Sequence, residues 1–114
     1  MEIVGEKLYF TGSVSSGFPV TSGVYDGSHN GSLDVIVASV NAAGSTGYVA
    51  TFYGASGTDI GSGIKRVSTT SCAGELEEFL LVFGTTEGDD LPTLNINNEP
   101  FYENQNQGGE DIFF

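Results

Sequence analysis

The amino-acid sequence predicts an all-β fold, organised as an antiparallel β-sandwich. Its 114 residues include 17 Gly, 8 Phe and 5 Tyr together with abundant Ser and Thr, a composition typical of short strands joined by tight turns. Segments with apolar residues at alternate positions recur between turn-forming residues. The length suits one domain that buries roughly two thirds of its unfolded surface. We place this sandwich domain at residues 1–96 and an extended C-terminal arm at residues 97–114.

Four strand candidates lie in the first half of the chain. Residues 7–11 and 18–25 flank a polar segment, and Pro19 favours an edge position for the second of them. Residues 33–40 alternate apolar and polar side chains, with further apolar residues on the other face that indicate partial burial there too. Residues 47–53 follow a turn-rich segment, so the last two candidates are expected to pair as an antiparallel hairpin.

Further candidates in the second half complete a set of about eight strands, and they are residues 64–69, 76–83 and 91–96. Residues 54–63 are expected to form a glycine-rich loop, which lacks the Gly-Lys-Ser/Thr ending of a phosphate-binding loop. The apolar positions of the strands define the expected core, namely Leu33, Val35, Val37, Phe52, Phe79, Leu81 and Leu94.

One of these candidates also fits a helix. Its apolar residues fall at the spacing of a helical face, at Leu76, Phe79, Leu80 and Phe83. The β context favours a strand, because residues 79–83 form a short apolar run that ends at a Gly-Thr-Thr turn. Such a run fits a strand buried on both faces of a sandwich.

The charge is strongly acidic and unevenly distributed. Fifteen Asp and Glu against three Lys and Arg give a net charge of −12, and residues 67–114 hold ten acids with no base. Nucleic acid is therefore a poor partner, since affinity for it depends on Lys and Arg that neutralise phosphates. Two readings of the acidity stay open: a solvated surface that keeps the protein soluble, or adaptation to a saline habitat.

Compartment and membrane signals are few. Cys72 is the single cysteine, so an internal disulfide is impossible and an oxidising compartment is not indicated. The first ten residues carry acids where a signal peptide needs positive charge, and no apolar run approaches the length of a membrane helix. We expect a soluble product made in the cytoplasm, with no membrane partner and no cofactor.

The most specific chemical motif is a weak candidate for a metal site. Asp26, Ser28, Asn30 and Gly31 match the opening half of an EF-hand calcium loop, and Asp26, Asn30 and Asp34 could form a different calcium site with oxygen ligands. Val37 stands where the bidentate Glu should be, and Asp26-Gly and Asn30-Gly are also ordinary tight-turn dipeptides. Turns are therefore the alternative reading. The chain has one His, His29, which excludes a zinc site of several nitrogen ligands.

Other chemistry is weakly indicated. Residues 87–90, Glu-Gly-Asp-Asp, suit either a hard cation or a turn between two strands. No Gly-x-Ser-x-Gly nucleophile motif occurs. Paired acids for glycoside hydrolysis are present in number, but the chain has no Trp and is too short to form a substrate cleft. No catalytic residues are assigned, and we expect the protein not to be an enzyme.

The arm is expected to make subunit contacts. Its apolar residues are separated by Asn, Gln, Gly and acids, and they are Phe101, Tyr102, Ile112, Phe113 and Phe114. Such a segment has little continuous apolar surface to offset the entropy of ordering it. We expect these side chains to dock, by exchange between copies in preference to self-docking, because an exchanged arm adds hydrogen bonds along a neighbour's strand edge.

The order of these segments resembles that of small jelly-roll-type decoration, cement and fibre-head proteins of tailed-virus (bacteriophage-like) particles. The resemblance covers residues 23–96 and is carried by the runs Leu33-Asp-Val-Ile-Val, Gly47-Tyr-Val-Ala-Thr-Phe-Tyr, Ile64-Lys-Arg-Val, Phe79-Leu-Leu-Val and Gly88-Asp-Asp-Leu. It implies a jelly-roll-like sandwich and a non-enzymatic structural protein of the virion. The implied partners are a major capsid or tail protein and copies of the chain itself, as a homo-trimer.

A binding module is the alternative function. Residues 26–34 and 87–90 favour a β-sandwich that binds calcium, and exposed tyrosines allow a glycan ligand. A calorimetric titration with calcium discriminates between this module and a structural virion protein.

Overall fold

The computed structural model describes residues 1–44, 47–92, 106 and 108–114. The expected all-β class is confirmed, with seven strands and no helix in the described ranges. The first sheet is antiparallel, in the order β1-β2-β3-β4, with bounds Glu2–Val4, Lys7–Val14, Asp34–Asn41 and Val49–Tyr53. The second is also antiparallel, in the order β5-β6-β7, with bounds Asp59–Thr70, Leu76–Thr86 and Asp111–Phe113.

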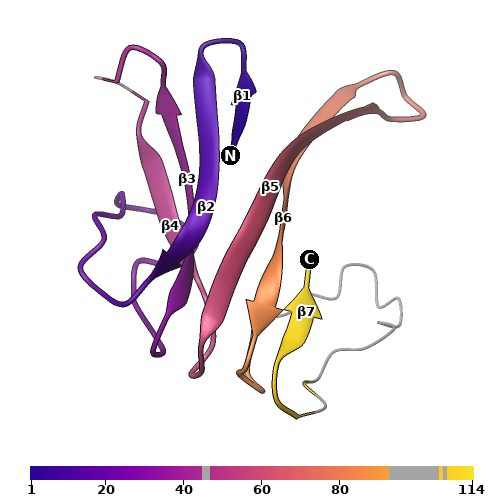
Figure 1. Cartoon of the computed structure of the whole chain (residues 1–114). Helices are drawn as coiled ribbons and strands as arrows, with labels where there is room; N and C mark the ends of the chain where they lie inside the picture. Colours follow the sequence, from indigo (N-terminus) through magenta and orange to yellow (C-terminus); the bar gives the residue numbers. More distant parts are fainter. Residues whose placement is uncertain (45–46, 93–105, 107) are drawn as a thin grey trace.

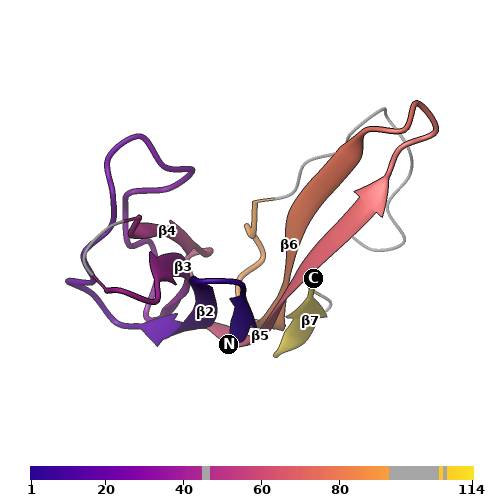
Figure 2. The same ribbon diagram turned by 90° about the horizontal axis from the view of Figure 1, so that it is seen from above.

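The two sheets meet where β5 lies beside β2 (Figure 1). The backbone N–H of Gly61 donates to Ser13 Oγ of β2 at 3.2 Å. A Cβ on Gly61 would lie 2.5 Å from Thr11 Oγ1 and 2.9 Å from the carbonyl oxygen of Gly12. Only glycine therefore lets the two strands approach so closely. Seen from above, the hairpin of β5 and β6 leads away from β3 and β4 (Figure 2).

The core lies on β3, β4 and the first half of β5. Its buried apolar side chains are Val35, Ile36, Ala38, Ala50, Phe52, Ala55 and Ile64. Val35 and Phe52 are as expected, whereas Leu33 and Val37 are half-buried. The expectation for Phe79 and Leu81 is wrong, since both are exposed, and Leu94 lies outside the described residues.

The β3–β4 hairpin confirms the sequence prediction closely. Val35 lies opposite Tyr53 and Ser39 opposite Val49, in the antiparallel register that the turn-rich segment between the strands predicts. β6 is a strand, as the β context favours, and not the helix that its apolar spacing also allows. The β context of this short apolar run therefore outweighs its helical spacing.

One strand prediction is wrong, and one loop prediction is wrong in part. Residues 18–25 contain no strand: the segment lies along β4 and bonds it at separated points, such as Thr21 N to Ala50 O at 3.1 Å. Pro19 has no N–H to donate, and Gly23 turns the chain at a φ of 73°. The glycine-rich segment 54–63 is not wholly a loop, because β5 begins at Asp59 and carries a bulge between Gly61 and Gly63.

The last residues of the chain form β7 on the edge of β6. Phe113 lies opposite Gly84, Ile112 opposite Thr85 and Asp111 opposite Thr86. The end of the arm thus pairs with its own chain here, and arm exchange between copies stays a prediction. Phe101 and Tyr102 lie outside the described residues, as do residues 93–96 of the last expected strand.

Candidate functional site

The hairpin of β5 and β6 exposes apolar side chains on the face that points away from the first sheet. Residues directly opposite in an antiparallel pair share a face, and the faces alternate along each strand. Phe79 lies opposite Val67, Leu81 opposite Lys65 and Phe83 opposite Gly63. These three apolar residues of β6 therefore project on one side. All three are exposed, although an apolar run in a strand is expected to be covered.

The same face continues onto the neighbouring strands. Thr85 lies opposite Ile60 of β5 and Ile112 of β7, so both isoleucines share the face of Phe83. We define the outer face as Ile60, Val67, Phe79, Leu81, Phe83 and Ile112. Apart from the half-buried Val67, these side chains are between 39% and 80% exposed. Contiguous apolar surface of this kind marks contact sites on soluble proteins.

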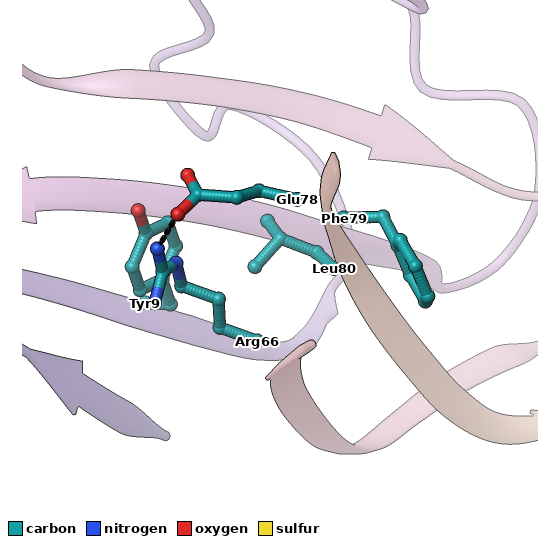
Figure 3. A pocket seen from close by; sticks show the side chains of 5 residues that line it. All are labelled: Tyr9, Arg66, Glu78, Phe79 and Leu80. Atoms are coloured by element: carbon teal, nitrogen blue, oxygen red, sulfur yellow. Dashed lines mark hydrogen bonds and ion pairs between the residues drawn. The ribbon is translucent and has the colours of Figure 1, made fainter. Parts of the chain in front are cut away.

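The opposite face of the hairpin turns toward the first sheet. A shallow pocket there is lined by Tyr9, Arg66, Glu78, Phe79 and Leu80, and the ring of Phe79 lies on the other side of β6 from the other four side chains (Figure 3). Arg66 and Glu78 form an ion pair across the hairpin. The face toward the first sheet thus carries this ion pair together with the apolar Ile64, Leu76 and Leu80, of which Leu76 and Leu80 are also exposed. The outer face carries Phe79, Leu81 and Phe83.

Glu2 of β1 fixes the start of the chain to β5. Its Oε1 lies 2.9 Å from Lys65 Nζ, and its Oε2 accepts a hydrogen bond from the backbone N–H of Arg66. These two contacts, Lys65 first, hold the pKa of Glu2 below its usual value of 4.5.

The described residues of the arm divide between the two faces. The ring centroids of Phe113 and Tyr53 are 5.7 Å apart, so Phe113 packs toward the first sheet. Burial raises the pKa of the Tyr53 phenol, with further effects from Tyr25 and Asp59. Ile112 joins the outer face, and Phe114 is almost fully exposed beyond it. The structure thus brings one of the predicted arm contacts to the outer face.

The weak metal candidates are close together, but their oxygens accept hydrogen bonds from the chain itself. Asp34 Oδ2 accepts from Asn30 N at 2.7 Å, and Oδ1 accepts from Gly31 N at 3.0 Å. Asp26 Oδ1 accepts from Ser28 N and its Oδ2 from Asn30 Nδ2, both at 2.8 Å. This geometry is that of side chains that close tight turns. Within the described ranges, no group of three or more His, Cys, Asp or Glu is arranged to hold a metal ion.

A second buried aspartate escaped the sequence analysis. Asp34 and Asp59 are both 0% exposed. Asp34 Cγ and Asp59 Oδ2 lie 2.8 Å and 2.9 Å from the point that a Cβ on Gly54 would occupy, so the carboxyl groups are neighbours across that glycine. Asp59 Oδ2 accepts from Ala55 N at 2.6 Å, and Asp59 Oδ1 is buried with no hydrogen-bond partner in the structure.

The two aspartates occupy equivalent places in adjacent segments. Each begins a strand and accepts from the backbone N–H of the residue four positions earlier. The segments run parallel, joined by the bridge between Leu33 and Thr58, by Ser32 N to Gly57 O at 2.8 Å and by Asp59 N to Leu33 O at 2.7 Å. In both segments, two Gly or Ser residues are followed by one further residue and then Asp, and this shared pattern could have drawn attention to the two aspartates. Backbone hydrogen bonds thus join the two segments, and the buried carboxylates lie at this junction and each accept from their own segment.

The acidic segment 87–90 reinforces the same junction. Asp90 Oδ1 accepts from the backbone N–H and the hydroxyl of Ser56, both at 2.9 Å. These bonds hold the pKa of the Asp90 carboxyl below its ordinary value. Glu87 N donates to the carbonyl oxygen of Thr58 at 3.0 Å. The turn reading accounts for these contacts.

Comparison with protein-family models, with curated proteins and with solved structures finds no match. Within the part of the chain that the structure describes, no helix is long and apolar enough to span a bilayer.

Proposed function

We propose that the chain is a non-enzymatic structural protein of a virus particle, a decoration, cement or tail accessory subunit. Its partners are a major capsid or tail protein and copies of itself. The observation that carries the proposal is the outer face, where Phe79, Leu81, Phe83 and Ile112 are exposed on one side of a sheet. A sheet with an apolar face needs a second layer, and a neighbouring subunit supplies it.

The jelly-roll-like arrangement belongs to the same proposal. Two antiparallel sheets meet at β2 and β5, and the hairpin of β5 and β6 leads away from β3 and β4 (Figure 2). The charge of the second half of the chain, with ten acids after Arg66, suits a basic lattice as a partner. β7 extends the outer face through Ile112, so the arm contributes to contact even where it pairs with its own chain.

Fractionation of the native source tests the virion assignment. Particles are banded by density, and each fraction is probed with an antibody raised against the purified chain. We expect the chain to band with particles and to be released when the outer-face variant Leu81→Asp replaces the native residue. A chain found only among free proteins overturns the proposal.

The second candidate is a calcium- or glycan-binding β-sandwich module. The observation that favours calcium is the buried Asp59 Oδ1, which has no hydrogen-bond partner beside a second buried carboxylate. Calcium at about millimolar concentration should then raise the melting temperature far more than sodium chloride of matched ionic strength. The structural proposal predicts equal effects of the two salts.

A further inference from the structure

We infer that the outer face is covered by the same face of a second copy of the chain, which forms a two-layered, two-fold symmetric dimer. This inference rests on the proposed function, because it names the neighbour that the outer face receives first. A two-fold contact uses the same patch on both subunits, so the patch must be compatible with itself. The residues of the outer face meet that condition in charge, in shape and in size.

The charge of the outer face permits self-contact. Along the described strands, the charged side chains on this face are Lys65, which is paired with Glu2 of β1, and Glu77. The whole chain carries −12, so most other surfaces would bring carboxylates against carboxylates when two copies meet. Close like charges oppose contact by up to several kcal/mol. The outer face avoids this repulsion.

The shape of the outer face suits a second sheet. The apolar residues of β6 stand at alternate positions, Phe79, Leu81 and Phe83, and Ile60 and Ile112 flank them on the neighbouring strands. Two such faces packed at about 10 Å form the core of an aligned sandwich. Each copy then supplies the layer that the other lacks.

The size of the outer face predicts a modest affinity. β5 has 12 residues and β6 has 11, which at about 3.4 Å per residue gives a face roughly 37 Å long. Two strands and the short β7 make it roughly 10–14 Å wide. Two copies would bury on the order of 1,000 Å², near the lower limit of specific interfaces. The dimer should therefore dissociate on dilution, and its strength should respond to salt.

Salt distinguishes a second copy from a basic partner. Two copies repel each other through their net negative charge, so added salt screens that repulsion and strengthens the dimer. A complex between this chain and a basic surface would weaken in salt for the same reason. The sign of the salt effect therefore reports which occupant covers the outer face.

Sedimentation equilibrium of the full chain tests the inference. The runs are made at about 0.05 and 0.5 M sodium chloride, with a reductant because Cys72 is exposed and free. We expect a monomer–dimer equilibrium that shifts to dimer at the higher salt, by at least about threefold in the association constant. Leu81→Asp should abolish the dimer. Val49→Asp is the matched control, because Val49 is 48% exposed on β4 and Leu81 is 39% exposed on β6.

Each result decides one way. A dimer that survives Leu81→Asp, or one that weakens in salt, overturns the inference. If Leu81→Asp does not fold by circular dichroism, Phe79→Ser replaces it and should lower the association constant at least tenfold without adding charge. A chain that is monomeric at every concentration also overturns the inference, and the proposed function then stands only if Leu81→Asp still releases the chain from particles.

Discussion

Among the described residues, the largest side chains that are fully buried are Val35, Asp34 and Asp59. Burial of a charge is costly unless it is hydrogen-bonded or paired. Asp34 receives two backbone N–H groups, while Asp59 receives one and leaves Oδ1 without a partner. His29 Nε2 lies 3.8 Å from Asp34 Oδ1 and adds positive charge only when protonated. The junction of the two sheets is thus held by polar contacts at some electrostatic cost.

Substitutions at Asp59 separate its hydrogen bond from its charge. Asp59→Ala leaves the N–H of the buried Ala55 without an acceptor, so the free energy of unfolding should fall by about 1–3 kcal/mol. Asp59→Asn keeps a carbonyl oxygen of the same shape and removes the buried charge, so its loss should be smaller. Urea unfolding measures both values. Equal losses would show that the hydrogen bond to Ala55 contributes little.

Gly54 is a position where any side chain should be harmful. A Cβ there would lie within 3 Å of two carboxyl groups that backbone N–H groups hold in place. Gly54→Ala should therefore cost about 1–3 kcal/mol of unfolding free energy through overpacking. Gly12→Ala is the control, since a Cβ on Gly12 meets nothing within 4 Å, and it should be neutral or slightly stabilising. Similar melting temperatures for the two variants would contradict this account.

Glu2 gives the attachment of β1 a defined pH dependence. Its folded-state pKa is lowered by Lys65 and by the N–H of Arg66, so its contribution to stability is present above the unfolded value of 4.5. That contribution is lost as the pH falls through the folded-state pKa. The melting temperatures of the wild type and Glu2→Gln should therefore differ at neutral pH and converge in acid. A difference that does not change with pH would refute the ion-pair role.

At the scale of elements, the sequence predicts strands better than it predicts what covers them. The alternation in residues 33–40 and the following turn led directly to β3 and β4. The apolar run 79–83 is a strand, as its sequence predicts, but the prediction that this strand is buried on both faces is wrong. A run of apolar residues indicates that a strand needs cover, and it does not say whether the same chain provides it.

Glycines explain the other misses among the elements. Residues 54–63 look like a loop because glycine is typical of turns, yet Gly61 serves the close approach of β5 to β2. The buried Asp34–Asp59 pair depends on a parallel contact between segments that are 25 residues apart. Local patterns do not report such tertiary contacts. The repeated Gly/Ser pattern before Asp34 and Asp59 marks the two segments as alike, but it does not show that they lie side by side.

Substitution by Asp should destabilise the first sheet much more than the outer face of the second sheet. Val35→Asp buries an unpaired charge in β3 and should cost several kcal/mol, on the order of the largest single-site effects. Leu81→Asp adds a charge to an exposed position on β6 and should change the stability of the monomer by about 0.5 kcal/mol or less. Thermal unfolding of dilute protein, followed by circular dichroism, compares them. Equal destabilisation would mean that the outer face is covered within the monomer.

At the scale of the whole molecule, charge and apolar surface act against each other. The net charge of −12 opposes contact between copies, whereas the exposed outer face favours contact on one side of the β5–β6–β7 sheet. In the proposed dimer, the balance between the two depends on salt. The resemblance to virion proteins, the copy number and the exchange of the arm stay predictions within this picture.

Hydroxyl-radical footprinting tests the central claim most directly, because it reads side-chain exposure at the outer face itself. Labelling of Phe79, Leu81 and Phe83 is followed by mass spectrometry in dilute protein and in concentrated or particle-bound protein. Tyr25 is the internal control, since it is exposed outside the outer face. We predict that labelling of the three β6 residues falls on assembly while that of Tyr25 is unchanged. Unchanged labelling of the β6 residues, with loss at Tyr25, would contradict the account.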